Sequence, residues 1–336
     1  EMMTPRDFIQ QPSRWLKQLD RRPSAAAQAA GDNTADAPNT YAVVPNFALE
    51  LAVRYGKEQA GEDLDLSAIK GIIIGSEPVR QSAVEEFYKA FEGNGLQRAA
   101  LRPSYGMAEA ALLITTPQTE NRPVFARFDR EALAAGEAKV VDDSVEAGVT
   151  FSSNGQPVRP MAFTIVDPET RSELPDGKVG EIWIAGANVA SGYLDRAEET
   201  ADTFHNTLGE KLSDGSRVAN VADDTKWLAT GDLAVVLDGE VYITGRLKDL
   251  IVVAGRNHYP QDIEATVQEA SAHVRPDSVA AFSVGEDSTE ELVLIIERAD
   301  DADASGDAAA TEAIRTAVTS HHGVTPAVIE FVNPLE

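Results

Sequence analysis

The sequence predicts an α/β protein with more than one domain. Its 336 residues, of which 43% are hydrophobic and 25% charged, are enough for one large or two medium domains with a buried core. Residues 69–74 form a continuous apolar run, which is typical of a parallel strand buried on both faces. Residues 234–237 and 241–243 are apolar runs joined by Asp238-Gly239, a pair that indicates a two-residue hairpin because it tolerates positive φ. We therefore expect a parallel sheet with helices and a separate antiparallel part.

The composition argues against several classes of function. Acidic residues outnumber Lys and Arg by 55 to 29, and the resulting net charge of −26 gives a surface that repels nucleic-acid phosphates. No apolar run approaches the ~20 residues of a membrane span, and the N-terminus lacks the pattern of a secretory signal. Cysteine is absent, which excludes disulfides, thiolate nucleophiles and Cys-ligated zinc. We expect no nucleic-acid partner, no membrane span and a cytoplasmic location.

The N-terminal part begins with two short helices. Thr4-Pro5 caps and begins the first, and Pro12 begins the second, which carries Trp15, Leu16 and Leu19 inward. Residues 24–40 lack apolar periodicity and are predicted to form a loop. A strand at 41–44 follows, and then a helix that places Phe47, Leu51 and Tyr55 on one face.

Two strands of the predicted parallel sheet lead into polar loops. The strand at 69–74 is followed by Gly75-Ser76-Glu77-Pro78 and by a helix with an apolar stripe through Val84 and Phe87. The strand near 98–102 is followed by Ser104-Tyr105-Gly106-Met107-Ala108-Glu109, with a helix predicted through 112–114. Ligands of such sheets bind beyond the carboxyl ends of the strands, so both loops are expected at the rim of one site.

The second of these loops combines three kinds of group that suit a nucleotide. Gly106 lets the backbone approach a phosphate, and Tyr105 offers an aromatic face to a purine. Glu109 supplies a carboxylate oxygen, which is the ligand that Mg²⁺ prefers. Taken alone, the same residues also fit an ordinary helix start with a surface acid.

The hairpin predicts a second group of site residues. Asp232 and Arg246 fall at the strand ends away from the Asp238-Gly239 turn, where both reach one pocket. Lys248 follows in a short crossover, and a strand through 250–254 and a helix beginning at Pro260 come next. Each charged residue taken alone is also compatible with a solvated strand end.

The remaining segments carry weaker signals. Residues 118–149 have loop character with a short helix near 130–135, and residues 151–184 alternate short strands and turns. A small α/β unit is expected beyond Asp249. Its strands are predicted at 279–284, 292–297 and 327–332, with a helix that ends near His322. There a cationic His321 or His322 would suit the helix dipole, and neither has an evident catalytic partner.

Four of these motifs together resemble those of the adenylate-forming enzymes. They are Tyr105-Gly106-x-x-Glu109, Thr230-Gly231-Asp232, Gly245-Arg246-x-Lys248-Asp249 and the run at 255–264, and the last favours the fatty-acyl-AMP ligase branch of mycolic-acid or polyketide pathways. Ala108, where many acyl-CoA ligases carry Thr, favours the same branch. Residues 180–186 with 192–194 resemble a further signature of the superfamily, whose role there is mainly structural.

The resemblance implies a fold and a set of roles. Residues 1–247 would be the C-terminal part of the large AMP-binding domain. This part would consist of an α/β subdomain at 1–117 and of an insertion and distorted β-barrel at 118–247. Residues 248–336 would be the small mobile domain. By resemblance Tyr105 stacks on adenine, Glu109 holds Mg²⁺, Asp232 and Arg246 hold the ribose, and Lys248 is the hinge between the domains. Residues 118–150 would be the insertion that restrains the small domain. The other nucleotide contacts implied are Gly75, Ser76, Glu77, Pro78, Ser104, Gly106, Met107, Ala108 and Ile243.

The implied reaction uses ATP and Mg²⁺ to convert a long-chain fatty acid into acyl-AMP and pyrophosphate. The acyl group would then pass to the phosphopantetheine thiol of an acyl carrier protein or polyketide synthase carrier domain. The chain has no Gly/Ser/Thr-rich phosphate loop and stops before the expected Ser-Gly-Lys segment, so we expect an inactive C-terminal fragment of the enzyme. Two alternatives stay open: an acyl-CoA ligase or peptide-synthetase adenylation domain, and a non-catalytic nucleotide-binding or interaction module.

Overall fold

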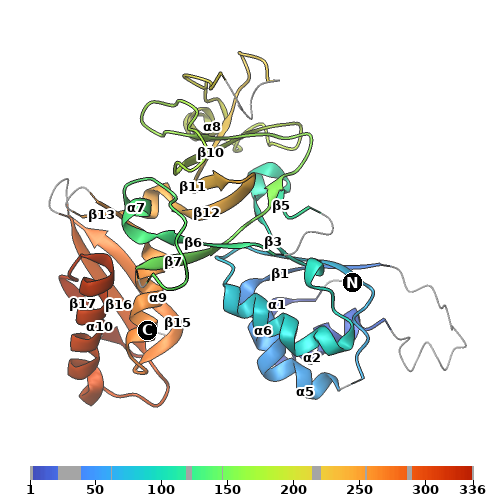
Figure 1. The fold of residues 1–336 in the computed structure, drawn as a ribbon, viewed down its shortest axis with the longest axis vertical. Helices are drawn as coiled ribbons and strands as arrows, with labels where there is room; N and C mark the ends of the chain where they lie inside the picture. The colour runs from blue at the N-terminus through green and yellow to red at the C-terminus, as the bar shows by residue number, and fades with distance from the viewer. Residues whose placement is uncertain are drawn as a thin grey trace, which may run out of the picture.

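A computed structural model describes residues 3–21, 39–61, 63–118, 123–145, 147–213, 221–253, 256–285 and 290–334. The chain forms an N-terminal region (residues 3–103), a middle region (104–246) and a C-terminal region (247–334). In Figure 1 the C-terminal region lies on the left and the N-terminal region on the right, with the middle region above and between them. Most of the loop predicted at 24–40 lies outside the described residues. The mixed α/β fold is as predicted, and the exact boundaries at 117 and 247 stay predictions.

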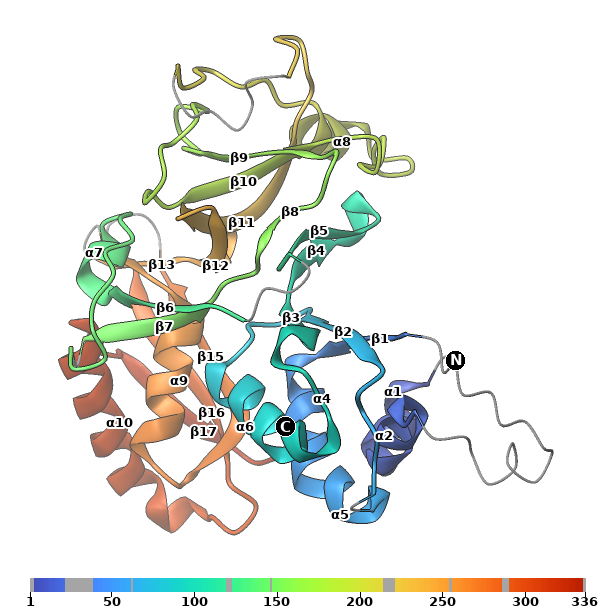
Figure 2. The ribbon, with the colours of Figure 1, turned by 45° about the vertical axis from the view of Figure 1, so that its right-hand side comes forward.

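The N-terminal region is a parallel sheet with helices on one side, as Figure 2 shows. The strand order is β1-β2-β3, so the apolar strand β2 is central and pairs with β1 along one edge and with β3 along the other. The strands are β1 (Thr40–Pro45), β2 (Ile69–Gly75) and β3 (Leu101–Pro103). The helices are α1 (Pro5–Gln10), α2 (Ser13–Leu19), α4 (Asn46–Leu51), α5 (Lys57–Ala60) and α6 (Gln81–Phe91), with short turns η1 (Ala52–Gly56), η2 (Glu92–Asn94) and η3 (Arg98–Ala100). Their core contains the predicted Trp15, Leu16, Leu19, Val84 and Phe87.

The helix predicted after β1 differs in its second half. After α4 the chain adopts a π-helical turn, η1, so that the four-residue step linking Phe47, Leu51 and Tyr55 is broken. Tyr55 is 47% exposed, whereas Leu49 and Ala52 are fully buried. The turn brings Gly56 against α2, where an added Cβ would lie 3.0 Å from the Leu16 side chain. Tertiary packing therefore overrides the regular helical period here.

The middle region contains three sheets. The largest has the order β12-β11-β10-β9 and is antiparallel throughout. Its strands are β9 (Ala162–Val166), β10 (Gly180–Ala185), β11 (Leu228–Leu237) and β12 (Glu240–Arg246). The others are β4 (Tyr105–Met107) with β5 (Leu112–Thr116) and β8 (Gln156–Pro157), and β6 (Phe125–Asp129) with β7 (Gly148–Ser152); the helices are α7 (Arg130–Ala134), α8 (Ala197–Phe204) and the short η4 (Ala108–Ala110). Within the described residues these sheets stay open, so the expected distorted barrel is not closed.

One predicted helix of this region is wrong. Residues 112–114 begin strand β5 instead of continuing a helix from Glu109. Ala111 has φ 52° and Leu112 has φ 89°, and this left-handed backbone cannot extend a right-handed helix. The Asp238-Gly239 hairpin is confirmed: both residues have positive φ, and Asp232 pairs directly with Arg246 across β11 and β12.

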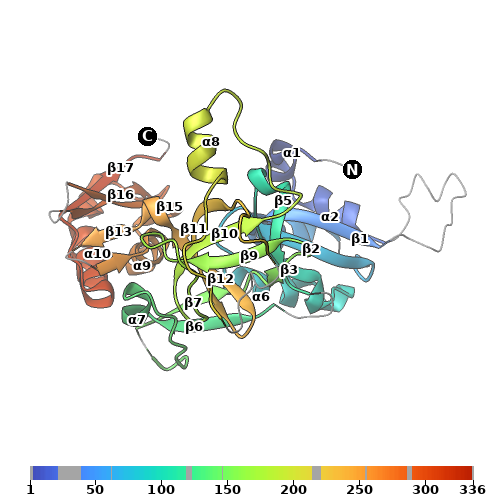
Figure 3. The ribbon, with the colours of Figure 1, turned by 90° about the horizontal axis from the view of Figure 1, so that it is seen from above.

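The C-terminal region is a three-stranded sheet covered by two helices. The strands β15 (Val274–Val284), β16 (Glu291–Arg298) and β17 (Val328–Val332) pair in that order. The helices α9 (Pro260–Ala270) and α10 (Asp307–His322) lie on the same side of this sheet (Figure 3). A hairpin of β13 (Ile251–Val253) and β14 (Arg256–His258) precedes α9, and η5 (Leu247–Asp249) and η7 (Ala304–Gly306) are single turns. All predicted elements of this unit are present.

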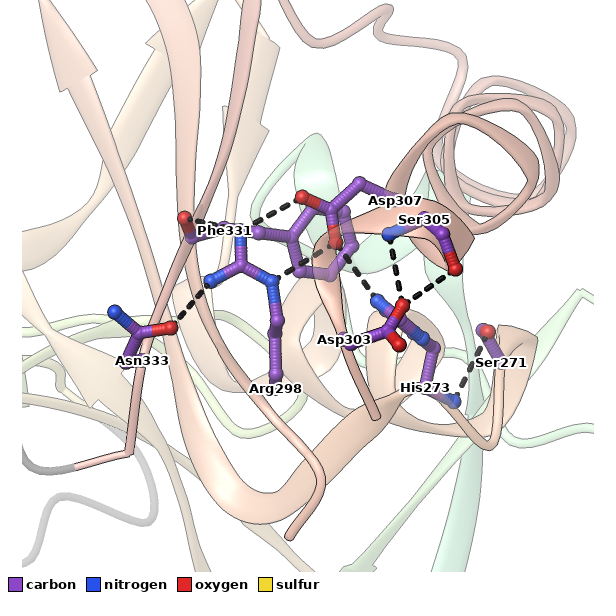
Figure 4. A network of polar contacts seen from close by, with 8 residues as sticks. All are labelled: Ser271, His273, Arg298, Asp303, Ser305, Asp307, Phe331 and Asn333. Atoms are coloured by element: carbon purple, nitrogen blue, oxygen red, sulfur yellow. Dashed lines mark hydrogen bonds and ion pairs between the residues drawn. The ribbon is translucent and has the colours of Figure 1, made fainter. Parts of the chain in front are cut away.

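Two polar networks hold this region. In one, Arg298 and His273 converge on Asp307 at the start of α10, and Arg298 also binds the carbonyl of Phe331 on β17, as Figure 4 shows. In the other, α7 of the middle region contacts α9: Arg130 donates to both oxygens of Asp262 at 2.5 and 2.9 Å. The restraint predicted for 118–150 stays a prediction, but α7 within that segment does contact the C-terminal region.

The cationic role expected for His322 is wrong. The ring is buried, and burial lowers its pKa to about 4, so it is neutral at pH 7. Its Nε2 lies 2.8 Å from the Thr266 hydroxyl, and its Nδ1 lies 3.6 Å from Asp262. It therefore has a carboxylate neighbour that could not be seen in the sequence, because α9 and α10 meet only in the fold.

Candidate active site

The carboxyl ends of β2 and β3 meet in a close backbone contact. A Cβ at Gly75 would lie 2.9 Å from the carbonyl oxygen of Ser104, so glycine is required for this approach. Ser104 is fixed by its N–H, which donates to Ile74 O at 2.8 Å. The next residue after Gly75, Ser76, has φ 68°, and Glu77 accepts a 2.7 Å hydrogen bond from the N–H of Phe47. The two predicted loops, 75–78 and 104–109, therefore form one rim.

The turn that carries Tyr105 is tight. A Cβ at Gly106 would lie 1.7 Å from the carbonyl oxygen of Leu112, so no other residue fits between β4 and β5. Tyr105, Met107 and Ile243 are partly buried and pack against the same hydrophobic cluster. Ile243 comes from β12, so this cluster joins the rim to the hairpin.

Tyr105, Asp232 and Arg246 come into direct contact. The Tyr105 hydroxyl donates to Asp232 Oδ2 at 2.6 Å, and Arg246 Nε donates to Asp232 Oδ1 at 3.0 Å. Burial, and then the adjacent Asp232 carboxylate, raise the pKa of Tyr105, so its hydroxyl stays a proton donor. Two predicted site residues that are 127 positions apart thus share one hydrogen bond.

A buried carboxylate supports the turn before Asp232. Gly231 has φ 74°, and its N–H donates to Glu181 Oε1 at 2.8 Å. Glu181 is 7% exposed and also accepts from Trp183 Nε1 at 2.8 Å. The sequence pattern around residues 180–186 predicts only a structural role and carries no signal of the support that Glu181 gives to the Asp232 turn. Only the pairing of β10 with β11 reveals it.

Glu109 lies in the turn η4 on the same rim. It is half-buried, and its Oε1 accepts a 2.8 Å hydrogen bond from the Tyr193 hydroxyl. The described residues contain no group of three or more His, Cys, Asp or Glu that could hold a metal by themselves. A single carboxylate does fit Mg²⁺, because this ion keeps water and substrate phosphates as most of its ligands.

Lys248 lies in η5, between the last strand of the middle region and the first strand of the C-terminal region. It is exposed, and within the described part of the chain it makes no hydrogen bond or ion pair. Its position between the two regions is compatible with a hinge, and that role stays a prediction.

Comparison with known proteins gives the family. Residues 18–194 match the model of the AMP-binding enzyme family, and residues 248–336 match that of the Disco-interacting protein 2-like AMP domain. The chain belongs to the AMP-binding enzyme family. The resemblance seen in the motifs is thereby confirmed.

The chain resembles several curated proteins. It is 38% identical to long-chain-fatty-acid–AMP ligase FadD32 of Mycolicibacterium smegmatis, over 96% of this chain and 53% of the relative. It is 41% identical to FadD26 of Mycobacterium tuberculosis, over 88% of this chain and 46% of the relative. It is 36% identical to a 4-hydroxyphenylalkanoate adenylyltransferase of the same organism, over 99% of this chain and 50% of the relative. The chain thus spans about half the length of these relatives.

Solved structures agree with the fold. A structure from work on fatty acyl-adenylate ligases of E. coli and L. pneumophila matches 98% of this chain and 52% of that chain, with a TM-score of 0.78 and 27% identity. A fatty acyl-adenylate ligase from L. pneumophila, in complex with acyl adenylate and pyrophosphate, matches 99% of this chain and 54% of that chain, with a TM-score of 0.61 and 31% identity. No helix in the described ranges is long and apolar enough to cross a membrane.

Proposed function

We propose that this chain is the rear part of an ATP-dependent ligase that converts a long-chain fatty acid into its acyl adenylate. The observation that supports this most is the contact of Tyr105 with Asp232 and of Asp232 with Arg246. These groups, from β4, β11 and β12, are those that the motifs assign to one adenosine. The names of the relatives favour a fatty acid as the second substrate.

The residues divide into a nucleotide-binding set with distinct tasks. The Tyr105 ring stacks on adenine, while Asp232 accepts hydrogen bonds from the ribose hydroxyls. The Arg246 side chain is 59% exposed, so it can turn from Asp232 to the nucleotide. Further contacts come from Ile243 and from the two rim loops, with Gly75, Ser76, Glu77 and Pro78 on one and Ser104, Gly106, Met107 and Ala108 on the other.

The reaction is a displacement at the α-phosphorus. A carboxylate oxygen of the fatty acid forms a bond to this phosphorus, and the bond to the bridging oxygen breaks so that pyrophosphate leaves with the electron pair. Both reactants are anionic, and Mg²⁺ held through Glu109 would offset that charge at the phosphates. Lys248 is the proposed pivot by which the C-terminal region moves before acyl transfer.

The second half-reaction would hand the acyl group to a thiol. The sulfur of a phosphopantetheine group, on an acyl carrier protein or a polyketide synthase carrier domain, forms a bond to the acyl carbon. The bond from that carbon to the phosphate oxygen breaks, AMP leaves with the electron pair, and the thiol proton is lost to solvent. The cytoplasmic location stays a prediction, and so does the length of the fatty chain.

The test uses the complete product of the gene. We expect pyrophosphate release and acyl-AMP when ATP and a long-chain fatty acid are both present, and acyl transfer to a carrier protein but not to CoA. Transfer to CoA would favour the acyl-CoA ligase alternative. If only a 4-hydroxyphenylalkanoate is adenylated, the acid substrate is of that class and not a long-chain fatty acid. If no acid is adenylated, the remaining hypothesis is a non-catalytic nucleotide-binding module.

We also expect the 336 residues alone to release no pyrophosphate. They contain no Gly/Ser/Thr-rich phosphate loop and no Ser-Gly-Lys segment to grip the phosphates. Pyrophosphate release that depends on both ATP and fatty acid, from this chain alone, would contradict that expectation.

A further inference from the structure

The loop at residues 186–194 contacts Glu109 directly, although its sequence pattern suggested only a structural role. We propose that Tyr193 is a positioning residue, which holds the Glu109 carboxylate in the orientation that receives the divalent cation of the bound nucleotide. This inference rests on the proposed function, because it assumes that Glu109 faces a metal-bound nucleotide.

Three hydrogen bonds join the loop to the Glu109 turn. The Tyr193 hydroxyl donates to Glu109 Oε1 at 2.8 Å. The N–H of Ala190 donates to the carbonyl oxygen of Glu109 at 2.7 Å, and the Asn188 amide donates to the carbonyl of Ala110 at 3.0 Å. The loop therefore holds the backbone of the turn as well as the side chain.

The turn needs such support because its backbone is strained. Ala111 and Leu112 lie two and three positions after Glu109 and have φ values of 52° and 89°, in the left-handed region that residues with a Cβ rarely adopt. Strained residues of this kind persist only when their surroundings over-determine them, and they concentrate at functional sites. The contacts from Asn188 and Ala190 supply that constraint.

Tyr193 is itself held by two residues of α8. Its ring packs edge-on against Phe204 of α8, with ring centroids 5.1 Å apart and planes at 76°. Its N–H donates to the Thr200 hydroxyl at 2.9 Å. Gly192 has φ 144°, and a Cβ there would lie 2.3 Å from Thr200 Cγ2, so only glycine lets the loop pass so close to α8. The hydroxyl therefore reaches Glu109 from a fixed position.

The chemistry of the donor suits a metal ligand. A tyrosine hydroxyl orients Oε1 and leaves the negative charge of the carboxylate in place. A Lys or Arg side chain in the same position would neutralise that charge. Among the described residues, no protein group forms a hydrogen bond or ion pair with the second oxygen, so it stays available to a cation. Mg²⁺ commonly binds through one carboxylate oxygen together with substrate phosphates.

The experiment compares Tyr193→Phe, Glu109→Gln and the control Tyr242→Phe in the complete gene product. Tyr242 is buried beside Phe128, and its hydroxyl makes no hydrogen bond among the described residues. Mn²⁺ is titrated in the presence of α,β-methylene-ATP, and free Mn²⁺ is read by electron paramagnetic resonance. AMP affinity is measured separately by calorimetry.

We expect Tyr193→Phe to weaken Mn²⁺ binding about 10-fold, as befits a lost hydrogen bond to a charged group. Glu109→Gln should weaken it at least as much, and Tyr242→Phe should not change it. AMP affinity should stay the same in Tyr193→Phe, because Tyr105 and Asp232 are untouched. A merely structural role would instead weaken Mn²⁺ and AMP binding together, which would overturn the proposal.

Two further outcomes separate this inference from the proposed function. If Tyr193→Phe binds Mn²⁺ as wild type does while Glu109→Gln does not, the positioning role is wrong and the function stands. If Glu109→Gln also binds Mn²⁺ normally, the inference is overturned, and acyl-AMP formation by the wild type decides the function independently.

Discussion

The carboxylates of the candidate site and those of the C-terminal region are held by different kinds of partner. At the site, Glu109 and Asp232 each accept a hydrogen bond from a tyrosine hydroxyl, at 2.8 and 2.6 Å. In the C-terminal region, Asp307 and Asp262 are each bound by an arginine, and Asp307 also by His273 (Figure 4).

This difference distinguishes carboxylates that stabilise the fold from carboxylates that remain available to bind a ligand or a metal ion. A guanidinium that binds both oxygens neutralises the carboxylate and satisfies most of its lone pairs. A phenol hydroxyl fixes the orientation of the group but leaves its charge in place. Asp232 also contacts Arg246, whose side chain is 59% exposed and can therefore turn toward a ligand. The expectations below test this division.

The largest effect is expected for Arg130→Met. The Arg130 and Asp262 side chains are only 17% and 11% exposed, so the variant leaves a poorly solvated carboxylate without its cation. We expect the opening free energy of α9 to fall by about 3 kcal/mol, measured by hydrogen exchange of its backbone amides. The matched control is Arg256→Met, because the Arg256–Glu131 pair is 49% and 80% exposed and should contribute less than about 1 kcal/mol.

A double variant sharpens this test. Arg130→Met with Asp262→Leu removes both charges, and we expect it to be more stable than Arg130→Met alone. Equal exchange rates in α9 of the wild type and Arg130→Met would show that this pair does not hold the two regions together.

The next effect is expected for Asp232→Asn. The substitution keeps the size of the side chain but removes the charge that is proposed to receive the ribose hydroxyls. We expect AMP affinity in the complete gene product to fall by about 2 kcal/mol, or roughly 30-fold, by calorimetry. Asp307→Asn should leave AMP affinity unchanged, because its carboxylate serves stability. An Asp232→Asn variant that binds AMP within two-fold of wild type would break the comparison.

Asp307→Asn should instead change stability in a pH-dependent manner. The hydrogen bond from Arg298 is the main cause that lowers the pKa of Asp307 from 3.8 to about 2. A carboxyl whose pKa is lower in the folded state stabilises that state above its unfolded pKa, and this contribution is lost as the pH falls toward the folded value. We expect the variant to be about 1–2 kcal/mol less stable at pH 7.

The thermal unfolding of both proteins, followed from pH 7 to pH 2, gives the measurement. The difference between wild type and Asp307→Asn should be constant at neutral pH and should shrink between pH 3.8 and about 2. A difference that does not change with pH would mean that the asparagine acts through packing alone.

The sequence predicts local features well and the partners of side chains poorly. The hairpin and the buried strand β2 follow from Asp238-Gly239 and from a run of apolar residues, which are short-range signals. The helix assigned to 112–114 fails because close packing of Gly106 against Leu112 forces a left-handed backbone that apolar periodicity does not encode. Strand β6 lies in a segment for which the sequence predicts a loop, because its pairing with β7 depends on a distant segment.

The candidate site shows the same division. Tyr105, Glu109, Asp232 and Arg246 were found because each belongs to a compact motif. The roles of Glu181 and Tyr193 could not be predicted in this way. Glu181 contacts Gly231, 50 positions away, and Tyr193 contacts Glu109, 84 positions away, and one sequence alone carries no signal of such pairing.

The smallest effect is expected for Tyr105→Phe. The variant keeps the ring that would stack on adenine and removes only the hydrogen bond to Asp232 Oδ2. We expect AMP affinity to fall by about 1 kcal/mol, or roughly five-fold, since the carboxylate keeps its charge and its contact with Arg246. The preference for AMP over 2′-deoxy-AMP should fall as well, because Asp232 would no longer be held toward the ribose. In an Asp232→Asn background the same change should cost less, since coupled residues are not additive. Full additivity in this cycle would show that the hydroxyl does not act through Asp232.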